Sequence, residues 1–228
     1  MATVVLTRPQ GKNQVLAQAL SQRGVSCLQL PALQITPTLA SLPDSFHPQN
    51  YDLLVFVSAQ AVQYYLKALT SSGFDFAQNQ AIATVGAASA APFYKQGLNH
   101  RLRLIHPAAT HPYQDSEALW DLLQPSLDQF ERVLLVRGQQ GREWLSQQFI
   151  QHHKELSRCI IYQRRPVQWP TESAIQLQRD LVKPQTVTFL LTSSESTLAI
   201  YDNMVRLGLE TAWKQACFVA IHPRIADK

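Results

Sequence analysis

Charged and hydroxyl side chains stand directly after several short apolar runs of this sequence. They are Arg8, Ser58, Gly86 with Ser89, Arg137 with Arg142, and Ser193 with Ser194. If the runs are parallel strands, their carboxyl ends form the edge at which open α/β sheets bind ligands. Helix N-termini at that edge present free N–H groups and the positive end of a dipole, which suits carboxylates. The pattern therefore predicts a site for an anionic ligand.

Each of these residues also has a simpler interpretation. A single serine such as Ser58 or Ser193 is more often a helix N-cap, and a cap uses the same N–H groups that a carboxylate would use. The arginines could be solvated charges, although Arg8 and Arg137 match in two similar segments, which favours a shared role. The turn GQQGR at residues 138–142 is either a weak anion cradle or an ordinary strand-to-helix turn.

Tyr162 is the candidate proton donor of the sequence. It lies in the alternating stretch CIIYQRRPVQW, and Arg164 and Arg165 beside it make its surroundings positive. A tyrosine can act as a general acid or orient a leaving group by hydrogen bonding. The alternative interpretation is a tyrosine that only packs within a strand.

Metal and nucleophile chemistry find no support in the sequence. It contains no H-E-x-x-H, G-x-S-x-G, Walker A or G-x-G-x-x-G motif. His152 and His153 fall at the end of a predicted helix, and the three cysteines are far apart, without the spacing of a metal site. No metal and no cofactor are therefore expected.

Short apolar runs alternate with amphipathic segments, which is typical of parallel sheets covered on both faces. Pro9 is predicted to open a helix that Gly24 ends. The predicted strands are Thr3–Thr7, Val25–Leu30, Asp52–Val57, Ala81–Val85, Arg132–Val136, Thr186–Leu191 and Cys217–Ile221.

The chain contains a faint internal repeat. VVLTRPQ at Val4–Gln10 matches VLLVRGQ at Val133–Gln139, an offset of 133 − 4 = 129. Two further pairs of similar segments are LVFVS with FLLTS, and TVG with AIH. The order of the matching segments along the chain indicates two similar parallel-sheet (flavodoxin-like) α/β domains, one of them discontinuous. The continuous domain is predicted at 38–166, and the discontinuous one, apparently truncated at its C-terminal end, at 1–34 with 171–228. The chain then crosses near 31–37 and 160–170, and these crossings are expected to pair as a two-stranded antiparallel linker.

Composition is consistent with an ordinary globular protein that has an anionic partner. The chain has 228 residues, a formal net charge of +4 and a pI near 9.1, so a nucleic acid, a membrane surface or a polyacid could bind, although this charge is also ordinary. The basic residues are spread out and not interleaved with aromatics, which disfavours nucleic acid. The N-terminus lacks the pattern of a signal peptide, and no apolar run is long enough to span a membrane. A cytoplasmic monomer is expected.

Taken in order, several motifs resemble those of the uroporphyrinogen-III synthases. They are VLTRP, FVSAQAV, ATVG followed by a hydroxyl, LLVRGQQGRE, IIYQRR and FLLTSSES. The family's fold is two α/β domains joined by a two-stranded linker. Two departures stand out: Ser89 replaces the threonine of many members, and His222-Pro223-Arg224 replaces a glycine-and-threonine pattern. The chain also stops where the family continues with another helix and strand.

The resemblance implies roles for the candidate residues. Tyr162 stands at the tyrosine usually proposed to assist loss of the substrate hydroxyl. The implied substrate ligands are Ser58, Ser89 and Ser193 at hydroxyl positions, and Arg8, Arg137, Arg142 and Arg164 at or near basic positions. With Arg137 among them, Arg137→Glu is expected to weaken substrate binding.

The implied enzyme is a cofactor-free lyase of porphyrin and heme biosynthesis. Its substrate is hydroxymethylbilane, a linear tetrapyrrole with eight carboxylates, which could be handed over transiently by hydroxymethylbilane synthase. The enzyme cyclises it with loss of water and inversion of ring D, through an azafulvene and a spiro intermediate. The competing interpretation is a two-lobed binding or sensor domain for an anionic small molecule, without catalysis; the lack of an export signal counts against it.

Overall fold

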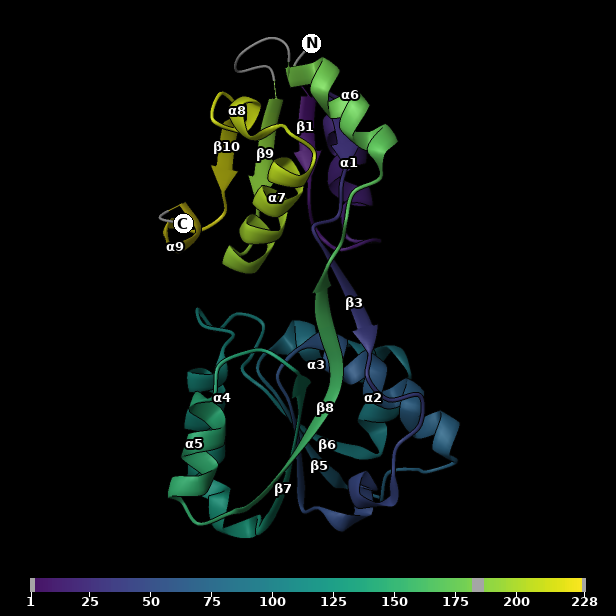
Figure 1. Ribbon diagram of the computed structural model, residues 1–228. Coiled ribbons are helices and arrows are strands. Elements are labelled where there is room, and N and C mark those ends of the chain that lie inside the picture. The colour runs from purple at the N-terminus through teal and green to yellow at the C-terminus, as the bar shows by residue number, and fades with distance from the viewer. Residues whose placement is uncertain (1–2, 182–186, 227–228) are drawn as a thin grey trace. The chain divides into compact units, whose positions relative to one another are not determined.

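The computed structural model describes residues 3–181 and 187–226, which form two compact units (Figure 1). The continuous unit comprises Thr36–Gln163, and the discontinuous unit comprises Met1–Ile35 with Arg164–Lys228. Thr186, at the start of one predicted strand, the Arg224 side chain and the C-terminal Lys228 lie outside the described residues. Within the described ranges, no helix combines the length and the apolar character that crossing a bilayer requires.

The continuous unit is built on a doubly wound parallel sheet. Its strands are β4 (Leu53–Phe56), β5 (Gln80–Thr84), β6 (Leu102–Ile105), β7 (Arg132–Gly138) and β8 (Glu155–Pro166), with β3 (Leu33–Pro37) beside β8. The sheet order is β3-β8-β7-β4-β5-β6, and the pairs from β8 to β6 are parallel. Counted from β6 to β8 and numbered by their order in the chain, these five strands run 3-2-1-4-5. The direction of winding therefore reverses between β4 and β7. Ligands of such sheets bind beyond the carboxyl ends of the strands at the point of reversal.

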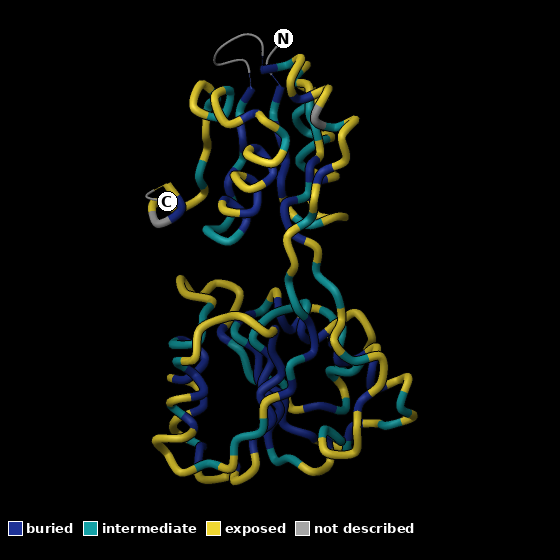
Figure 2. The backbone as a smooth tube through the Cα atoms, in the orientation of Figure 1, coloured by how far each residue is buried: buried dark blue, intermediate teal, exposed yellow. Residues whose placement is uncertain are grey.

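Helices cover both faces of this sheet. They are α2 (Ala59–Ser72), α3 (Ala87–Lys95), α4 (Ser116–Leu123) and α5 (Trp144–Gln151), with short 3-10 segments at Asp44–Phe46, Pro48–Asn50, Leu98–His100 and Gln124–Gln129. On one face Phe56 packs edge-on against Tyr65 of α2 and Phe93 of α3, with ring centroids 5.3 and 5.5 Å apart. On the other face Leu53 and Val55 belong to a buried cluster with residues of α4 and α5. All residues of β4 and β5 are buried as a result (Figure 2).

The discontinuous unit has a smaller parallel sheet. Its strands are β1 (Thr3–Leu6), β2 (Ser26–Gln29), β9 (Val187–Leu191) and β10 (Cys217–Ala220), in the order β10-β9-β1-β2. Its helices are α1 (Gln14–Ser21), α6 (Thr171–Leu181), α7 (Ser194–Arg206), α8 (Glu210–Trp213) and α9 (Pro223–Ala226). Trp169, Phe189 and Met204 lie in its buried core.

The start of the first helix differs from the prediction. Pro9 was expected to open it, whereas α1 begins at Gln14. Gly11 has φ +82°, which a right-handed helix cannot include, so residues 9–13 form a turn instead. The Asn13 side chain donates to the carbonyl of Arg8 at 2.9 Å and holds this turn against the end of β1.

The internal repeat is confirmed by the two sheets. The order β10-β9-β1-β2 in one unit corresponds to β5-β4-β7-β8 in the other. β1 and β7 carry the matching segments, and Ser26, the first residue of β2, falls at Glu155, the first residue of β8, with the same offset of 129 (26 + 129 = 155). The predicted fold of two similar parallel-sheet α/β domains, one discontinuous, is therefore confirmed.

The two strands that carry the chain from one unit to the other pair with each other. The Thr38 N–H donates to the Ile161 carbonyl at 3.1 Å, and the Val167 N–H donates to the Ala32 carbonyl at 2.9 Å. Residue numbers therefore rise in β3 as they fall in β8, which is antiparallel pairing. The predicted two-stranded antiparallel linker is confirmed.

Asp52 ties the amino ends of β4 and β7 together and gives a prediction about acid stability. Burial alone would raise the pKa of Asp52, but hydrogen bonds to its carboxylate lower it. The carboxylate accepts the N–H groups of Glu131 and Arg132 at 3.0 and 2.8 Å and the Arg132 guanidinium at 3.3 Å. A lowered folded-state pKa contributes stability above the unfolded pKa of about 4, and that contribution is lost as pH falls through the folded value. We expect Asp52→Asn to unfold at a lower temperature than wild type at pH 7, with the difference narrowing below about pH 4. Thermal unfolding at pH 7, 4 and 3 checks this, and a gap independent of pH would contradict it.

Candidate active site

The carboxyl ends of β4, β5 and β7 meet at one edge of the continuous unit's sheet. Ser58 follows β4, Gly86 follows β5, and Gly138 closes β7. The strands pair in parallel, so the residues that follow them emerge on the same side. This edge, beside the reversal between β4 and β7, is where most of the predicted site residues of the unit gather.

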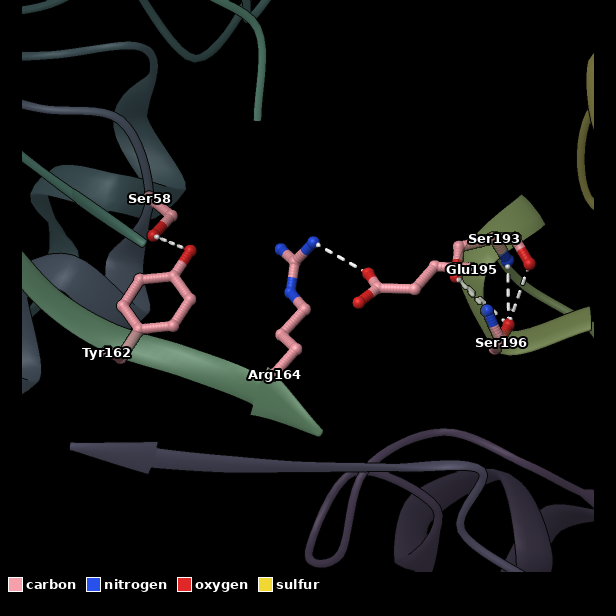
Figure 3. A network of polar contacts seen from close by, with 6 residues as sticks. All are labelled: Ser58, Tyr162, Arg164, Ser193, Glu195 and Ser196. Atoms are coloured by element: carbon pink, nitrogen blue, oxygen red, sulfur yellow. Dashed lines mark hydrogen bonds and ion pairs between the residues drawn. The ribbon is translucent and has the colours of Figure 1, made fainter. Parts of the chain in front are cut away.

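Tyr162 and Ser58 are hydrogen-bonded to each other at this edge (Figure 3). Ser58 is the N-cap of α2, and its Oγ accepts the N–H of Ala61 at 3.1 Å. The same Oγ lies 3.3 Å from the hydroxyl oxygen of Tyr162, and either hydroxyl can donate. Tyr162 is only 4% exposed, so its ring is packed as well as hydrogen-bonded. The two interpretations of Tyr162, packed residue and site residue, are thus compatible.

Gly138 contacts the ring of Tyr162. A Cβ at residue 138 would lie 2.5 Å from Cε2 and 2.6 Å from Cζ of that ring, closer than such atoms approach. A register shift between Arg137 and Gly138 brings Gly138 opposite Tyr162, and the Gln139 N–H donates to the Tyr162 carbonyl at 2.8 Å. The glycine therefore leaves the space that the tyrosine ring fills.

Arg137 turns into its own loop. The residue is 3% exposed; its Nε donates to the Gly138 carbonyl at 3.2 Å, and its Nη1 is paired with Glu143. A Cβ on Gly141 would lie 3.2 Å from Nη2, so the loop closes tightly over the guanidinium. These contacts make Arg137 the side chain around which residues 138–143 fold.

Arg142 is held by a glutamate of a neighbouring helix. Both of its terminal nitrogens donate to the carboxylate of Glu117 in α4, one of them at 3.1 Å. The hydrogen bond from Arg142 holds the pKa of Glu117 below its usual value, and the same bond raises the pKa of Arg142. The pair is exposed, so it contributes at most about 1 kcal/mol to stability.

The turn after β5 is occupied by a glutamine that sequence reasoning missed. Gly86 is the N-cap of α3, and the Gln114 Oε1 accepts the next N–H, that of Ala87, at 2.9 Å. A Cβ on Gly86 would lie 2.5 Å from this oxygen. Ser89 sits one turn further, 8% exposed. The Gln114 amide oxygen thus accepts one N–H at the start of α3, as a ligand oxygen could.

The discontinuous unit holds the remaining predicted residues. Ser193 is the N-cap of α7 in a capping box with Ser196, and Ser194 is the first, half-buried residue of that helix. Arg164 forms an ion pair with Glu195 at 3.4 Å (Figure 3). Arg8 is exposed after β1, and within the described part of the chain no hydrogen bond or ion pair of its side chain is found.

In the structure, Ser58 and Gly138 each contact Tyr162. The other predicted residues of this unit lie at or after the carboxyl ends of strands in the same sheet; they are Gly86, Ser89, Arg137 and Arg142. Sequence reasoning missed the carboxylates that pair with the arginines. Glu117 and Glu195 lie in the first turn of a helix after an N-cap, where acidic residues are favoured, and this was the available signal. Among the described residues, no group of three or more His, Cys, Asp or Glu is placed to hold a metal ion.

Comparison with known proteins points to one family. A family model described as uroporphyrinogen-III synthase HemD matches residues 14–228. A mutant uroporphyrinogen III synthase from the extremely thermophilic bacterium Thermus thermophilus is 15% identical and superposes with a TM-score of 0.61, over 100% of this chain and 87% of that one. The uroporphyrinogen-III synthetase of Helicobacter pylori is 15% identical, with a TM-score of 0.58 over 99% and 86%. At such identities the structural likeness establishes the fold.

Proposed function

The chain belongs to the uroporphyrinogen-III synthase HemD family, a family of hydro-lyases, and we propose that it cyclises hydroxymethylbilane to uroporphyrinogen III by means of Tyr162 and the basic and N–H groups around it. The single observation that carries the assignment of the site is the contact of the Tyr162 hydroxyl with Ser58 at the reversal of the sheet. A hydroxyl donor fixed at a ligand-binding edge is what departure of a hydroxyl group requires.

We propose that Tyr162 assists the first step, loss of hydroxide from the terminal hydroxymethyl group. The pyrrole nitrogen supplies the electrons, and a donor beside the leaving oxygen lowers the barrier by hydrogen bonding or proton transfer. The azafulvene is then attacked at the substituted carbon of the last pyrrole, and the spiro intermediate reopens and closes with this ring inverted. Because the free bilane closes without inversion, the protein's main task is to hold a folded substrate conformation.

The carboxylates of the substrate are proposed to bind at helix N-termini and arginines. The positions are Gly86, Ser89, Arg137 and Arg142 in the continuous unit, and Arg8, Arg164, Ser193 and Ser194 in the discontinuous one. Exposed N–H groups and guanidinium groups are the usual partners of carboxylates. Arg137 is buried and paired with Glu143, so its part in binding is proposed to be indirect, through the 138–143 loop that it holds.

The isomer of the product tests the proposed function. Freshly generated hydroxymethylbilane is incubated with and without the protein, and the porphyrins are separated after oxidation. Predominantly type III product is expected with the protein, and type I without it. Type I product at the spontaneous rate in both samples would reject the activity for this chain.

Arg8→Met tests whether the exposed arginine after β1 meets the substrate. Loss of one charge-assisted hydrogen bond is expected to raise KM about tenfold with little change in kcat. Arg23→Met is the matched control, because Arg23 is an exposed arginine of the same unit, bonded to the carbonyl of Ala19 near the end of α1. Steady-state kinetics of both variants decide the matter. Equal effects would mean that only overall charge matters, and Arg8 would not be a specific ligand.

We further propose that the protein acts in the cytoplasm as a monomer that receives the bilane directly from hydroxymethylbilane synthase. The spontaneous closure of the free bilane supports a short transfer, since delay would yield the wrong isomer. Assembling the two proteins and measuring the proportion of type I product in the presence of a bilane-trapping competitor tests this transfer.

A further inference from the structure

Ser58 and Gly138 both touch Tyr162. We infer that they are positioning residues, which fix the hydroxyl of Tyr162, and that Ser58 is not a ligand of a substrate carboxylate. The inference rests on the proposed function, because it assigns how the donor of that reaction is held.

The hydrogen bonds of Ser58 support this role. A serine hydroxyl has one hydrogen and two lone pairs. One lone pair accepts the Ala61 N–H and caps α2, and the hydroxyl also bonds to that of Tyr162, 104 residues away along the chain. The Ala61 N–H at the start of α2 is thereby bound to Ser58 itself. The cap holds the serine oxygen at a fixed point, and the serine oxygen in turn holds the phenol.

Gly138 fixes the ring from another side. The ring atoms Cε2 and Cζ of Tyr162 occupy the space in which a Cβ of residue 138 would stand. The backbone of the tyrosine is held by the Gln139 N–H, and its ring neighbours that of Tyr64 with centroids 6.2 Å apart. Backbone, ring and hydroxyl are thus each held by a separate contact, so little rotation of the phenol is left.

The internal repeat shows that this arrangement is particular to one unit. The equivalent cap in the discontinuous unit is Ser193, whose Oγ bonds to that of Ser196 at 3.0 Å. The repeat offset of 129 places Pro9 opposite Gly138 (138 − 129 = 9) and Leu33 opposite Tyr162 (162 − 129 = 33). Glycine and tyrosine therefore occur together where the cap bonds to a phenol, and both are replaced where it does not. Capping a helix does not by itself require them.

Ser58→Ala provides the first test. Loss of one hydrogen bond to the phenol is expected to lower kcat for type III product about fivefold to tenfold, with KM within about twofold of wild type. Ser58→Thr keeps a hydroxyl and a cap, so it should restore most of kcat. If Ser58 were a carboxylate ligand, Ser58→Ala would raise KM at nearly constant kcat, and that result would overturn the inference.

Ser72→Ala is the matched control for this serine. Ser72 lies at the other end of α2, where its Oγ accepts the Leu42 N–H at 2.6 Å and its single hydrogen faces the carbonyl of Ala68 at 2.9 Å and that of Leu42 at 3.2 Å. The same substitution in the same helix should lower the unfolding temperature and leave kcat and KM unchanged. An equal fall of kcat in both variants would show a general effect of stability and would reject the positioning role.

The two contacts should also be coupled to Tyr162 itself. Gly138→Ala is expected to lower kcat without raising KM, whereas Gly73→Ala should lower only stability, because Gly73 ends α2 with φ +69° and a Cβ there meets no atom within 4 Å. In the background of Tyr162→Phe, neither Ser58→Ala nor Gly138→Ala should lower kcat further. Fully additive losses would overturn the inference.

A spectroscopic measurement separates this inference from the proposed reaction. In protein labelled with 13C at Cζ of its seven tyrosines, the Tyr162 signal is the one missing from Tyr162→Phe. It should move in Ser58→Ala and Gly138→Ala and stay in place in Ser72→Ala. A signal unmoved by Ser58→Ala would overturn the positioning contact, whatever the activity. If wild type made no type III product while the signal moved, the contact would stand and the proposed function would fail.

Discussion

Replacing Tyr162 with phenylalanine is expected to lower kcat for uroporphyrinogen III formation at least about tenfold, while KM changes little. A donor beside the leaving oxygen acts mainly in the transition state, and general acid catalysis contributes about 10²–10⁴-fold in enzymes. The lower bound applies if the phenol only orients the leaving group, because a neutral hydrogen bond at the strong end of its usual range, about 1.5 kcal/mol, corresponds to about tenfold in rate. The rate of type III product at saturating bilane is the measurement.

The fold of this variant should persist, since the ring that fills the space beside Gly138 is kept. Its free energy of unfolding should fall by no more than about 1 kcal/mol. Tyr65→Phe is the matched control: Tyr65 is a buried tyrosine of the same unit whose hydroxyl donates to the Phe46 carbonyl at 3.0 Å. That variant should lose comparable stability and keep its kcat. An unchanged rate in Tyr162→Phe would remove Tyr162 from the mechanism.

Arg137→Glu is expected to raise KM at least about tenfold and to destabilise the continuous unit by about 3–5 kcal/mol. The variant places a buried carboxylate where the guanidinium of wild type donates to the Gly138 carbonyl and pairs with Glu143. A buried ion pair is thereby replaced by two neighbouring negative charges. The loop over residues 138–143 should lose its shape, and with it the anion-binding groups of this edge. Chemical unfolding and steady-state kinetics at a temperature where the variant is folded give both values.

Arg132→Glu separates the loop from general effects of charge. Arg132 lies at the amino end of the same strand and pairs with Asp52 at 3.3 Å, so its reversal also sets two carboxylates together. We expect this control to lose stability and to keep the KM of wild type. A folded Arg137→Glu protein with the KM of wild type would show that neither Arg137 nor its loop takes part in binding.

The two similar parallel-sheet units could be predicted from the sequence, because strands and repeated segments leave local patterns. Continuous apolar runs such as LLVF at Leu53–Phe56 indicate strands buried on both faces, and the match of Val4–Gln10 with Val133–Gln139 indicates a repeated unit. The sequential order of the matched units then requires one domain to be assembled from both chain ends. The same reasoning placed Ser58 and Gly86 after strands, whereas β7 extends beyond its apolar run and includes Arg137 and Gly138.

The contacts between these residues were decided by the tertiary structure. Ser58 and Tyr162 are hydrogen-bonded across 104 residues of sequence, and they meet only because β7 alone separates β4 from β8 in the sheet. The register shift at Gly138 and the turn of Gln114 onto Ala87 likewise depend on packing between distant elements. By itself the sequence determined two α/β units and the residues at their strand ends. Which hydroxyl bonds to Tyr162, and which carboxylate pairs with Arg142 or Arg164, depends on contacts between elements far apart in the chain, and local sequence does not specify those contacts.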